Sequence, residues 1–320
     1  MIKVLNTLHN LFTILVSGIS KLRKFKSLFF LFFLVGVSSL LTACNVDMSF
    51  LSPKGVISAQ QLTLFYTSII LMCIVVIPVI ILIFVFAWKY RASNKNAKYS
   101  PDWSHSTKIE VCMWTIPCVI ILALAIITWI SSHDLDPYKP LKTKNNEKPI
   151  VIQAVALEWK WLFIYPEQNI ATVNYLQFPA NVPITFKITS DAPMNSFMIP
   201  RLAGQIYAME GMQSQLHLMA NEEGIYPGRS TNFSGDGFSG MIFTAKASSK
   251  VEYQAWIQEV KSSSNNLTMK QYNKLSEPSE SNKVEYFSTV DHELFKKIIM
   301  KFMPSTEHSI DTNTNQEIQL

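Results

Sequence analysis

The stretch STNFSGDGFSGM, residues 230–241, has the spacing of a metal-binding loop but lacks metal-binding side chains. Ser230 and Ser234 stand four positions apart, Phe238 follows four positions later, and Met241 comes three positions after that. Soft metals such as copper are held by thiolate sulfur and imidazole nitrogen, and not by hydroxyl or phenyl groups. The loop therefore has the outline of a copper site without the ligands to hold copper.

Cysteine usage excludes thiol chemistry from the C-terminal half of the chain. The 320 residues include four cysteines, and all of them lie in the first 118 positions: Cys44, Cys73, Cys112 and Cys118. The region that contains the loop can therefore form no disulfide and supply no thiolate.

The histidines do not complete a metal site either. His217, in SQLHLMA, alternates with Leu216 and Leu218, which predicts an ordinary hydrogen-bonded or surface histidine on the polar side of a strand. Three others fall in segments that read as linker or tail: His133, His292 and His308.

The elements that would carry the loop begin with two membrane spans. Residues 69–88 and 111–130 contain no charged residue, and each run has the length that a helix needs to cross a bilayer. Pro78 and Pro117 are tolerated in membrane helices, because neighbouring groups satisfy the freed backbone. We expect a transmembrane hairpin over residues 62–131.

A third apolar run, SLFFLFFLVGVSSLLTAC, follows a basic cluster and closes on Cys44. This pattern resembles a bacterial lipoprotein signal, in which the cysteine is lipidated and becomes the mature N-terminus. It predicts a signal peptide over residues 1–43 and a lipid-anchored segment over residues 44–61. The alternative is an uncleaved anchor helix with an incidental cysteine.

Charge predicts the orientation of the spans. If Cys44 lies outside the inner membrane, residues 89–108 between the spans are cytoplasmic, and they carry five basic residues against Asp102 alone. Four lysines after the second span weaken this bias: Lys139, Lys142, Lys144 and Lys148. The net charge of +5 is spread over membrane flanks and does not indicate a nucleic-acid partner.

Beyond a linker at residues 132–148, short alternating runs predict a periplasmic antiparallel β-sandwich or barrel over residues 149–262. PITFKITS places Ile184, Phe186 and Ile188 on one face, and VEYQAWI has the same period. VALEWKWLFIY places six residues on one face: Val155, Leu157, Trp159, Trp161, Phe163 and Tyr165. Between the strands of this domain, no helix is expected until beyond residue 265.

The remaining residues predict a helical extension over residues 263–303 and a disordered tail over residues 304–320. Within the extension, DHELFKKIIMKF is typical of an amphipathic helix that begins at Asp291.

This layout resembles subunit II of the haem-copper respiratory oxidases, in which two helices precede a cupredoxin-like domain. IEVCMWTIP resembles the entry to the family's second span, and EWKWLFIYP resembles its aromatic strand. DAPMNSFMIP and GRSTNFSGDGFSGMIF resemble its two copper loops, in order and at the right separations. The resemblance covers about residues 44–302.

The resemblance also assigns the copper positions. The cysteines, histidines and methionine of the copper-binding members match Ser230, Ser234, Phe238, Asn195 and Met241, of which the methionine alone is retained. Asn232 replaces a residue that offers a backbone carbonyl. The resemblance therefore implies that this chain binds no metal and no cofactor, with haems and copper in a partner, the large subunit I.

A subunit II without copper implies a quinol oxidase, because lipid-soluble quinol can deliver electrons directly to the large subunit. The resemblance points to a cytochrome bo-type ubiquinol oxidase, which reduces oxygen to water and moves protons outward. It implies as partners subunit I, smaller membrane subunits and lipid, and excludes cytochrome c. A copper-bearing electron-entry subunit is excluded by the missing cysteines, and an independent membrane-tethered lipoprotein that binds or senses a small ligand remains the alternative.

Glu110 is the acidic residue at the entrance of the second span. A carboxylate in the first turn of a helix interacts favourably with the helix dipole. In the family, the matching glutamate lies at the cytoplasmic mouth of a proton-uptake path through the large subunit. Glu110 is thus a candidate for the proton path, and no residue of this chain is expected to be catalytic.

Overall fold

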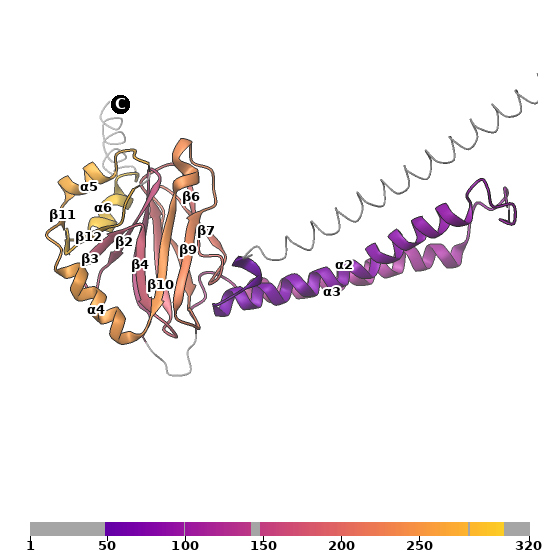
Figure 1. Ribbon diagram of the computed structural model, residues 1–320, viewed down its shortest axis with the longest axis horizontal. Helices are drawn as coiled ribbons and strands as arrows, with labels where there is room; N and C mark the ends of the chain where they lie inside the picture. The colour runs from indigo at the N-terminus through magenta and orange to yellow at the C-terminus, as the bar shows by residue number, and fades with distance from the viewer. Residues whose placement is uncertain (1–48, 99, 142–147, 281, 304–320) are drawn as a thin grey trace, which may run out of the picture. The chain divides into compact units, whose positions relative to one another are not determined.

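The computed structural model describes residues 49–98, 100–141, 148–280 and 282–303 (Figure 1). The signal peptide, Cys44 and the tail therefore lie outside the described residues. A short 3-10 turn, η2 (Ser49–Leu51), precedes the long helices α2 (Val56–Lys89) and α3 (Thr107–Asp134). Both helices are long and apolar enough to cross a membrane. They extend beyond the charge-free runs at both ends, and α2 already begins within the segment expected to be the lipid-anchored leader.

The described strands form two larger sheets and one small one. The first sheet has the order β12-β3-β2-β1-β5-β8, the second has the order β4-β10-β9-β6-β7, and β11 pairs with β13. The bounds are β1 Ile150–Leu157, β2 Lys160–Tyr165, β3 Ile170–Val173, β4 Tyr175–Pro179, β5 Ile184–Ser190, β6 Asn195–Met198, β7 Gln205–Ala208, β8 Ser214–Leu218, β9 Gly224–Ser230, β10 Ile242–Ser248, β11 Asn266–Leu267, β12 Glu285–Phe287 and β13 Thr289–Val290.

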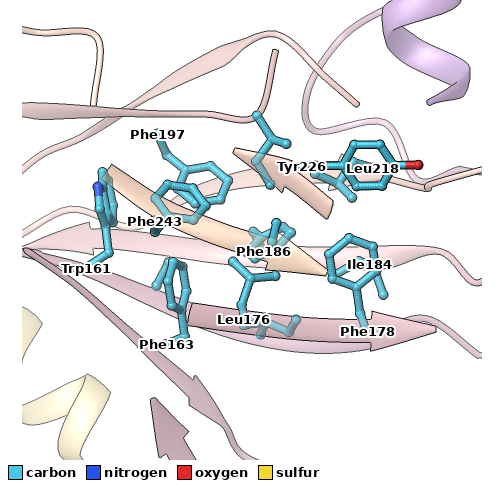
Figure 2. Close-up of a cluster of buried hydrophobic side chains, with 14 of the residues drawn as sticks. Trp161, Phe163, Leu176, Phe178, Ile184, Phe186, Phe197, Leu218, Tyr226 and Phe243 are labelled. Carbon is cyan, nitrogen blue, oxygen red and sulfur yellow. The ribbon is translucent and has the colours of Figure 1, made fainter. Parts of the chain in front are cut away.

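The two larger sheets enclose one aromatic core. Trp161 and Phe163 of β2 contact Phe197 of β6 and Phe243 of β10, with ring centroids 5.1–6.3 Å apart (Figure 2). All four side chains are buried. Such edge-on and stacked pairs add to the apolar area that holds two sheets together. The expected fold class, a membrane hairpin followed by a cupredoxin-like sandwich, is confirmed.

The strand pairing is mixed rather than purely antiparallel. β1 pairs with β5 in parallel, and β4 pairs with β10 in parallel, whereas the other pairs of the two larger sheets are antiparallel. Parallel neighbours need a long crossover, which alternation within single strands cannot predict.

The run VALEWKWLFIY is two strands and not one. β1 ends at Leu157 and β2 begins at Lys160, with a tight turn in which Trp159 has a φ of 59°. Val155 and Leu157 consequently pack in a second core behind the first sheet, whereas Trp161 faces the main core. The expectation of a single shared face was wrong, because a hairpin turn inside the run reset the alternation. For β5, by contrast, Ile184, Phe186 and Ile188 lie together in the main core as expected.

VEYQAWI is helical, and its assignment as a strand was wrong. It lies in α4 (Lys250–Lys261), which begins after Ser249, whose side chain accepts a hydrogen bond from the backbone N–H of Glu252. The buried residues of α4 have helical spacing: Tyr253, Trp256, Ile257 and Val260. Seven residues are too few to distinguish the two-residue period of a strand from the 3.6-residue period of a helix. The N-cap at Ser249 and the apolar stripe that continues to Val260 favour the helix.

The C-terminal residues form a mixed extension with α5 (Met269–Leu275) and α6 (Leu294–Met300). The last helix starts three residues later than the predicted Asp291. β12 adds to the edge of the first sheet beside β3.

Two buried charged residues of the β domain, Lys160 and Asp191, form hydrogen bonds that attach the extension to this domain. Lys160 donates to the carbonyl of Glu277 at 2.8 Å, and Asp191 accepts from Tyr272 at 2.5 Å and from Lys301 at 2.7 Å.

The first turn of α2 and the residue before it are joined to the β domain by a side-chain hydrogen bond and by backbone contacts. Ser58 is fully buried, and its hydroxyl donates to the carbonyl of Arg201 at 2.6 Å. Gly55 forms a β-bridge with Ala220, and a Cβ at Gly55 would lie 2.3 Å from the carbonyl oxygen of Leu202. A side chain at Gly55 is therefore incompatible with this joint.

Candidate functional site

The two loops at the predicted copper position are brought together by the pairing of β6 with β9. In this pairing Phe197 lies opposite Ser230, which places Asn195 and Ser230 next to each other. The Ser230 hydroxyl donates to the Asn195 side-chain carbonyl at 3.0 Å, and both residues are buried.

Further hydrogen bonds knit these loops into a polar network. The Asn195 amide donates to the carbonyl of Pro193 at 2.7 Å, and the Asn232 amide donates to the carbonyl of Met194 at 2.8 Å. The backbone N–H of Ser230 donates to the carbonyl of Met241 at 3.1 Å. Side-chain amides and hydroxyls therefore tie the two loops to each other directly.

Ser234 and Phe238 stand apart from this network. The carbonyl of Ser234 accepts a hydrogen bond from the Trp159 indole at 3.0 Å, and the Ser234 hydroxyl is buried with no partner among the described residues. Phe238 packs edge-on against Phe233, with ring centroids 5.6 Å apart, and Phe233 is 75% exposed.

The side chains at this position do not fit a copper centre. They offer an amide, two hydroxyls, a phenyl ring and one thioether, whereas copper requires thiolate or imidazole ligands. In the part of the chain that the structure describes, no three His, Cys, Asp or Glu side chains gather as a metal site would require.

Trp159 packs over the loop, a role that sequence reasoning did not assign to it. A Cβ at Gly237 would lie 2.4 Å from the Trp159 indole, and one at Gly235 would lie 3.4 Å from it. The glycine spacing in SGDG is typical of a close approach to another group. The glycine spacing predicts that another group approaches the backbone closely here, but it does not identify that group as Trp159.

Glu110 lies in the first turn of α3, as expected, and it has a partner that the sequence did not reveal. His105 Nδ1 lies 2.5 Å from Glu110 Oε1, and the two side chains are 62% and 45% exposed. His105 lies two positions before the start of α3, outside the helix. The backbone conformation just before Thr107 therefore determines whether the His105 imidazole reaches the Glu110 carboxylate.

His217 is a buried, hydrogen-bonded residue on β8. The Gln215 amide approaches its Nε2 at 2.8 Å, so Nδ1 carries the proton and donates to the Thr185 hydroxyl at 3.1 Å. Burial lowers the pKa of His217 below its ordinary value. This arrangement is that of a neutral structural histidine.

The fold and the loops together define a class of protein, namely a membrane hairpin with a cupredoxin-like domain whose copper loops have lost their ligands. Comparison with known families agrees. Residues 167–248 match the family described as cytochrome c oxidase subunit II, periplasmic domain, and residues 261–305 match the cytochrome oxidase aromatic-rich motif.

Individual relatives narrow the class. The cytochrome bo(3) ubiquinol oxidase subunit 2 of Pseudomonas aeruginosa is 54% identical over 80% of this chain and 77% of its own length. The ubiquinol oxidase subunit 2 of Acetobacter aceti is 52% identical over 89% of this chain and 92% of its own length. This chain belongs to the family of ubiquinol oxidase subunit 2 proteins, as its sequence motifs predicted.

Among solved structures, the periplasmic domain of subunit II of cytochrome oxidase (CoxB) of Bradyrhizobium japonicum matches at 18% identity. The match covers 38% of this chain and 96% of that chain, with a TM-score of 0.35.

Proposed function

We propose that this chain is subunit II of a cytochrome bo-type ubiquinol oxidase and acts there as a scaffold without a redox centre of its own. The complex is a quinol:oxygen oxidoreductase that couples the reduction of oxygen to proton translocation. The observation that carries the scaffold role is the donor set at the copper position, in which Asn195 and Ser230 hydrogen-bond to each other. The independent ligand-binding lipoprotein is not favoured, because identity to oxidase subunits extends over most of the chain.

The absence of thiolate and imidazole ligands at these positions is consistent with an oxidase in which electrons do not pass through this chain. An oxidase that takes electrons from a soluble donor needs a relay centre in the exported domain. Quinol dissolves in the bilayer and passes its electrons to haem in the large subunit, so no relay through this chain is needed. Haem and copper then reside in subunit I, and cytochrome c is not a partner.

The chain is an inner-membrane protein with a periplasmic domain, and we assign its finer organisation as follows. A signal over residues 1–43 is removed, Cys44 carries lipid on the periplasmic side, and the hairpin over residues 62–131 contacts subunit I. Smaller membrane subunits complete the complex. Glu110 takes up protons at the cytoplasmic side, where its contact with His105 supplies a second titratable group.

Metal analysis of the exported domain tests the scaffold role. We expect a fragment of residues 149–303 to purify without copper and to show no copper absorbance after incubation with copper, because metal binding needs ligands that are absent. Stoichiometric, tightly bound copper would contradict the proposal. Gentle solubilisation of membranes and capture of the full chain should also retain a much larger haem-bearing subunit, which an independent lipoprotein would lack.

A further inference from the structure

A group of unpaired positive charges lies at the end of the helical hairpin where α2 is connected to α3 (Figure 1). Residues 89–108 carry five positive charges and one negative charge, at Asp102, which is a net charge of +4. All five basic side chains are exposed, and none of them forms an ion pair in the part of the chain that the structure describes. We call these residues the hairpin cluster: Lys89, Arg91, Lys95, Lys98 and Lys108.

The lysines described near the opposite ends of α2 and α3 are neutralised within the chain. Each of them has its Nζ atom within 2.9 Å of a carboxylate oxygen, in the pairs Lys54–Glu222, Lys139–Asp134 and Lys148–Glu167. The chain therefore supplies carboxylates for its cations at that end of the hairpin. The hairpin cluster has no such partner, and its charge is available to an anion from outside the chain.

Exposed indole rings accompany the hairpin cluster. Trp88 is 74% exposed at the end of the apolar run of α2, and Trp103 is 66% exposed in the connection to α3. Indoles at the end of a membrane span favour the level of the lipid headgroups. Cζ of the Arg91 guanidinium lies 4.6 Å from the centroid of the Trp88 ring, which places this cation at the same level.

The backbone after α2 folds back on the helix end and leaves the charged groups unused. The Asn94 side-chain amide donates to the carbonyl of Lys89 at 2.6 Å, and the Asn94 backbone N–H donates to the carbonyl of Arg91 at 2.9 Å. Arg91 donates from Nε to the Ser93 hydroxyl at 3.0 Å, so its terminal N–H groups remain for a ligand. A guanidinium group matches the geometry of a phosphate particularly well.

These features together favour a membrane surface as the partner. Basic residues directly beyond a span, combined with exposed aromatic rings, are the pattern of segments that bind anionic lipid headgroups. The sign of the charge excludes a preference for zwitterionic headgroups, because their ammonium groups would meet five cations and find Asp102 alone as a carboxylate in this segment.

We propose that the hairpin cluster binds the headgroups of anionic phospholipids of the phosphatidylglycerol type. Arg91 donates to a phosphate oxygen beside the Trp88 ring, and Lys95 and Lys98 bind further headgroups at the same surface. The assignment of these lipids to the inner leaflet rests on the orientation given under the proposed function.

Native mass spectrometry of the complete oxidase complex, delipidated in a mild detergent and titrated with dioleoylphosphatidylglycerol, tests this surface. The triple variant Arg91→Gln, Lys95→Gln, Lys98→Gln removes three cations and keeps Lys89 and Lys108, the two that directly flank the spans and orient them. We expect the triple variant to bind dioleoylphosphatidylglycerol severalfold more weakly than the wild type. Raised salt should narrow the difference, because exposed charges are screened.

Two control variants separate a loss of charge at this place from other effects. The double variant Lys95→Arg, Lys98→Arg keeps both charges and should bind as the wild type does. Dioleoylphosphatidylcholine should bind the wild-type complex severalfold more weakly than dioleoylphosphatidylglycerol. The matched control removes three exposed lysines outside the hairpin and should leave the titration unchanged: Lys261→Gln, Lys270→Gln and Lys274→Gln.

Haem content and quinol-dependent oxygen uptake should be unchanged in the triple variant. The proposed function fails on a different observation, namely a captured chain without a haem-bearing subunit, and the lipid titration can be read with or without that subunit. Equal titration curves for the triple variant and the wild type, or equal binding of the two lipids, would overturn the lipid surface. A chemical cross-link in native membranes from Lys95 or Lys98 to an acidic segment of another subunit would also overturn it.

Discussion

At the scale of single residues, side-chain hydrogen bonds join the two loops at the copper position to each other. Asn195 and Ser230 are both buried; the Ser230 hydroxyl donates to the Asn195 side-chain carbonyl across the two loops, and the Asn195 amide donates to the Pro193 carbonyl of its own loop. A satisfied intramolecular hydrogen bond of this kind contributes about 1 kcal/mol, whereas a buried group left unpaired costs about 1–3 kcal/mol. The residues that replaced the ligands therefore keep the loops in place without metal.

Substitution of the single residue Glu110 tests whether its carboxylate acts in proton uptake. We expect Glu110→Ala to slow quinol-dependent oxygen uptake by the purified complex severalfold, and Glu110→Asp to recover part of the rate, because a carboxylate at the span entrance collects protons. Haem spectra of both variants should match the wild type. Full turnover in Glu110→Ala would leave Glu110 with its helix-dipole role alone, about 0.3–1 kcal/mol. Lost haem would assign it to assembly.

His217 predicts a pH dependence of stability. Its pKa in the folded domain lies below the ordinary value of 6.5, so the unfolded chain binds the proton first as the pH falls. The stabilisation from the neutral ring is present above about pH 6.5 and is lost as the pH falls towards the folded pKa. Urea unfolding of residues 149–303 between pH 7.5 and 5 should show a smaller loss for His217→Gln. Parallel curves for the two proteins would contradict this assignment.

At the scale of elements, the loop between β9 and β10 depends on the approach of the Trp159 indole to Gly237. A methyl group at Gly237 would overlap the ring, so Gly237→Ala should destabilise the exported domain by about 1–3 kcal/mol through overpacking. Gly240 lies three residues further on, and no heavy atom lies within 4 Å of a Cβ built there. Gly240→Ala should change stability by less than about 0.5 kcal/mol. Equal urea midpoints for the two variants would show that the indole moves aside freely.

The C-terminal extension is also an element held by specific contacts. Asp191 lies in the loop that follows β5, close in sequence to Asn195, and it accepts hydrogen bonds from Tyr272 and Lys301. Burial and the neighbouring Asp191 carboxylate raise the pKa of Tyr272. The extension therefore supports the same loop in which a copper ligand would have stood.

At the scale of the whole molecule, the proposed lipid on Cys44 and the two long helices should contribute unequally to membrane attachment. Cys44→Ser should block lipidation and leave the signal uncleaved, which intact-mass measurement of the purified chain would detect as a longer N-terminus. Both helices should still insert, because a transmembrane helix associates with the bilayer far more strongly than a single acyl chain does. An unmodified, uncleaved N-terminus in the wild-type chain would contradict the lipoprotein assignment.

The sequence by itself determined the features that depend on the types of neighbouring residues. The two apolar helices follow from long runs without charge, and the lack of thiolate and imidazole groups at the copper positions follows from the identities of Asn195, Ser230, Ser234 and Phe238. The family follows from motifs that occur in order, and its domain-scale fold follows with it. None of these inferences needs the distance between two residues far apart in the chain.

Only the tertiary structure decided which residues meet and which faces they share. The turn at Trp159 split one expected strand into two, and α4 became a helix because Tyr253, Trp256 and Ile257 bury one stripe against the sheets. The approach of Trp159 to Gly237 joins positions far apart in the chain, and the contact of His105 with Glu110 depends on how the chain enters α3. Such contacts are set by packing and by the path of the chain, because a short sequence window is compatible with more than one period and specifies no partner.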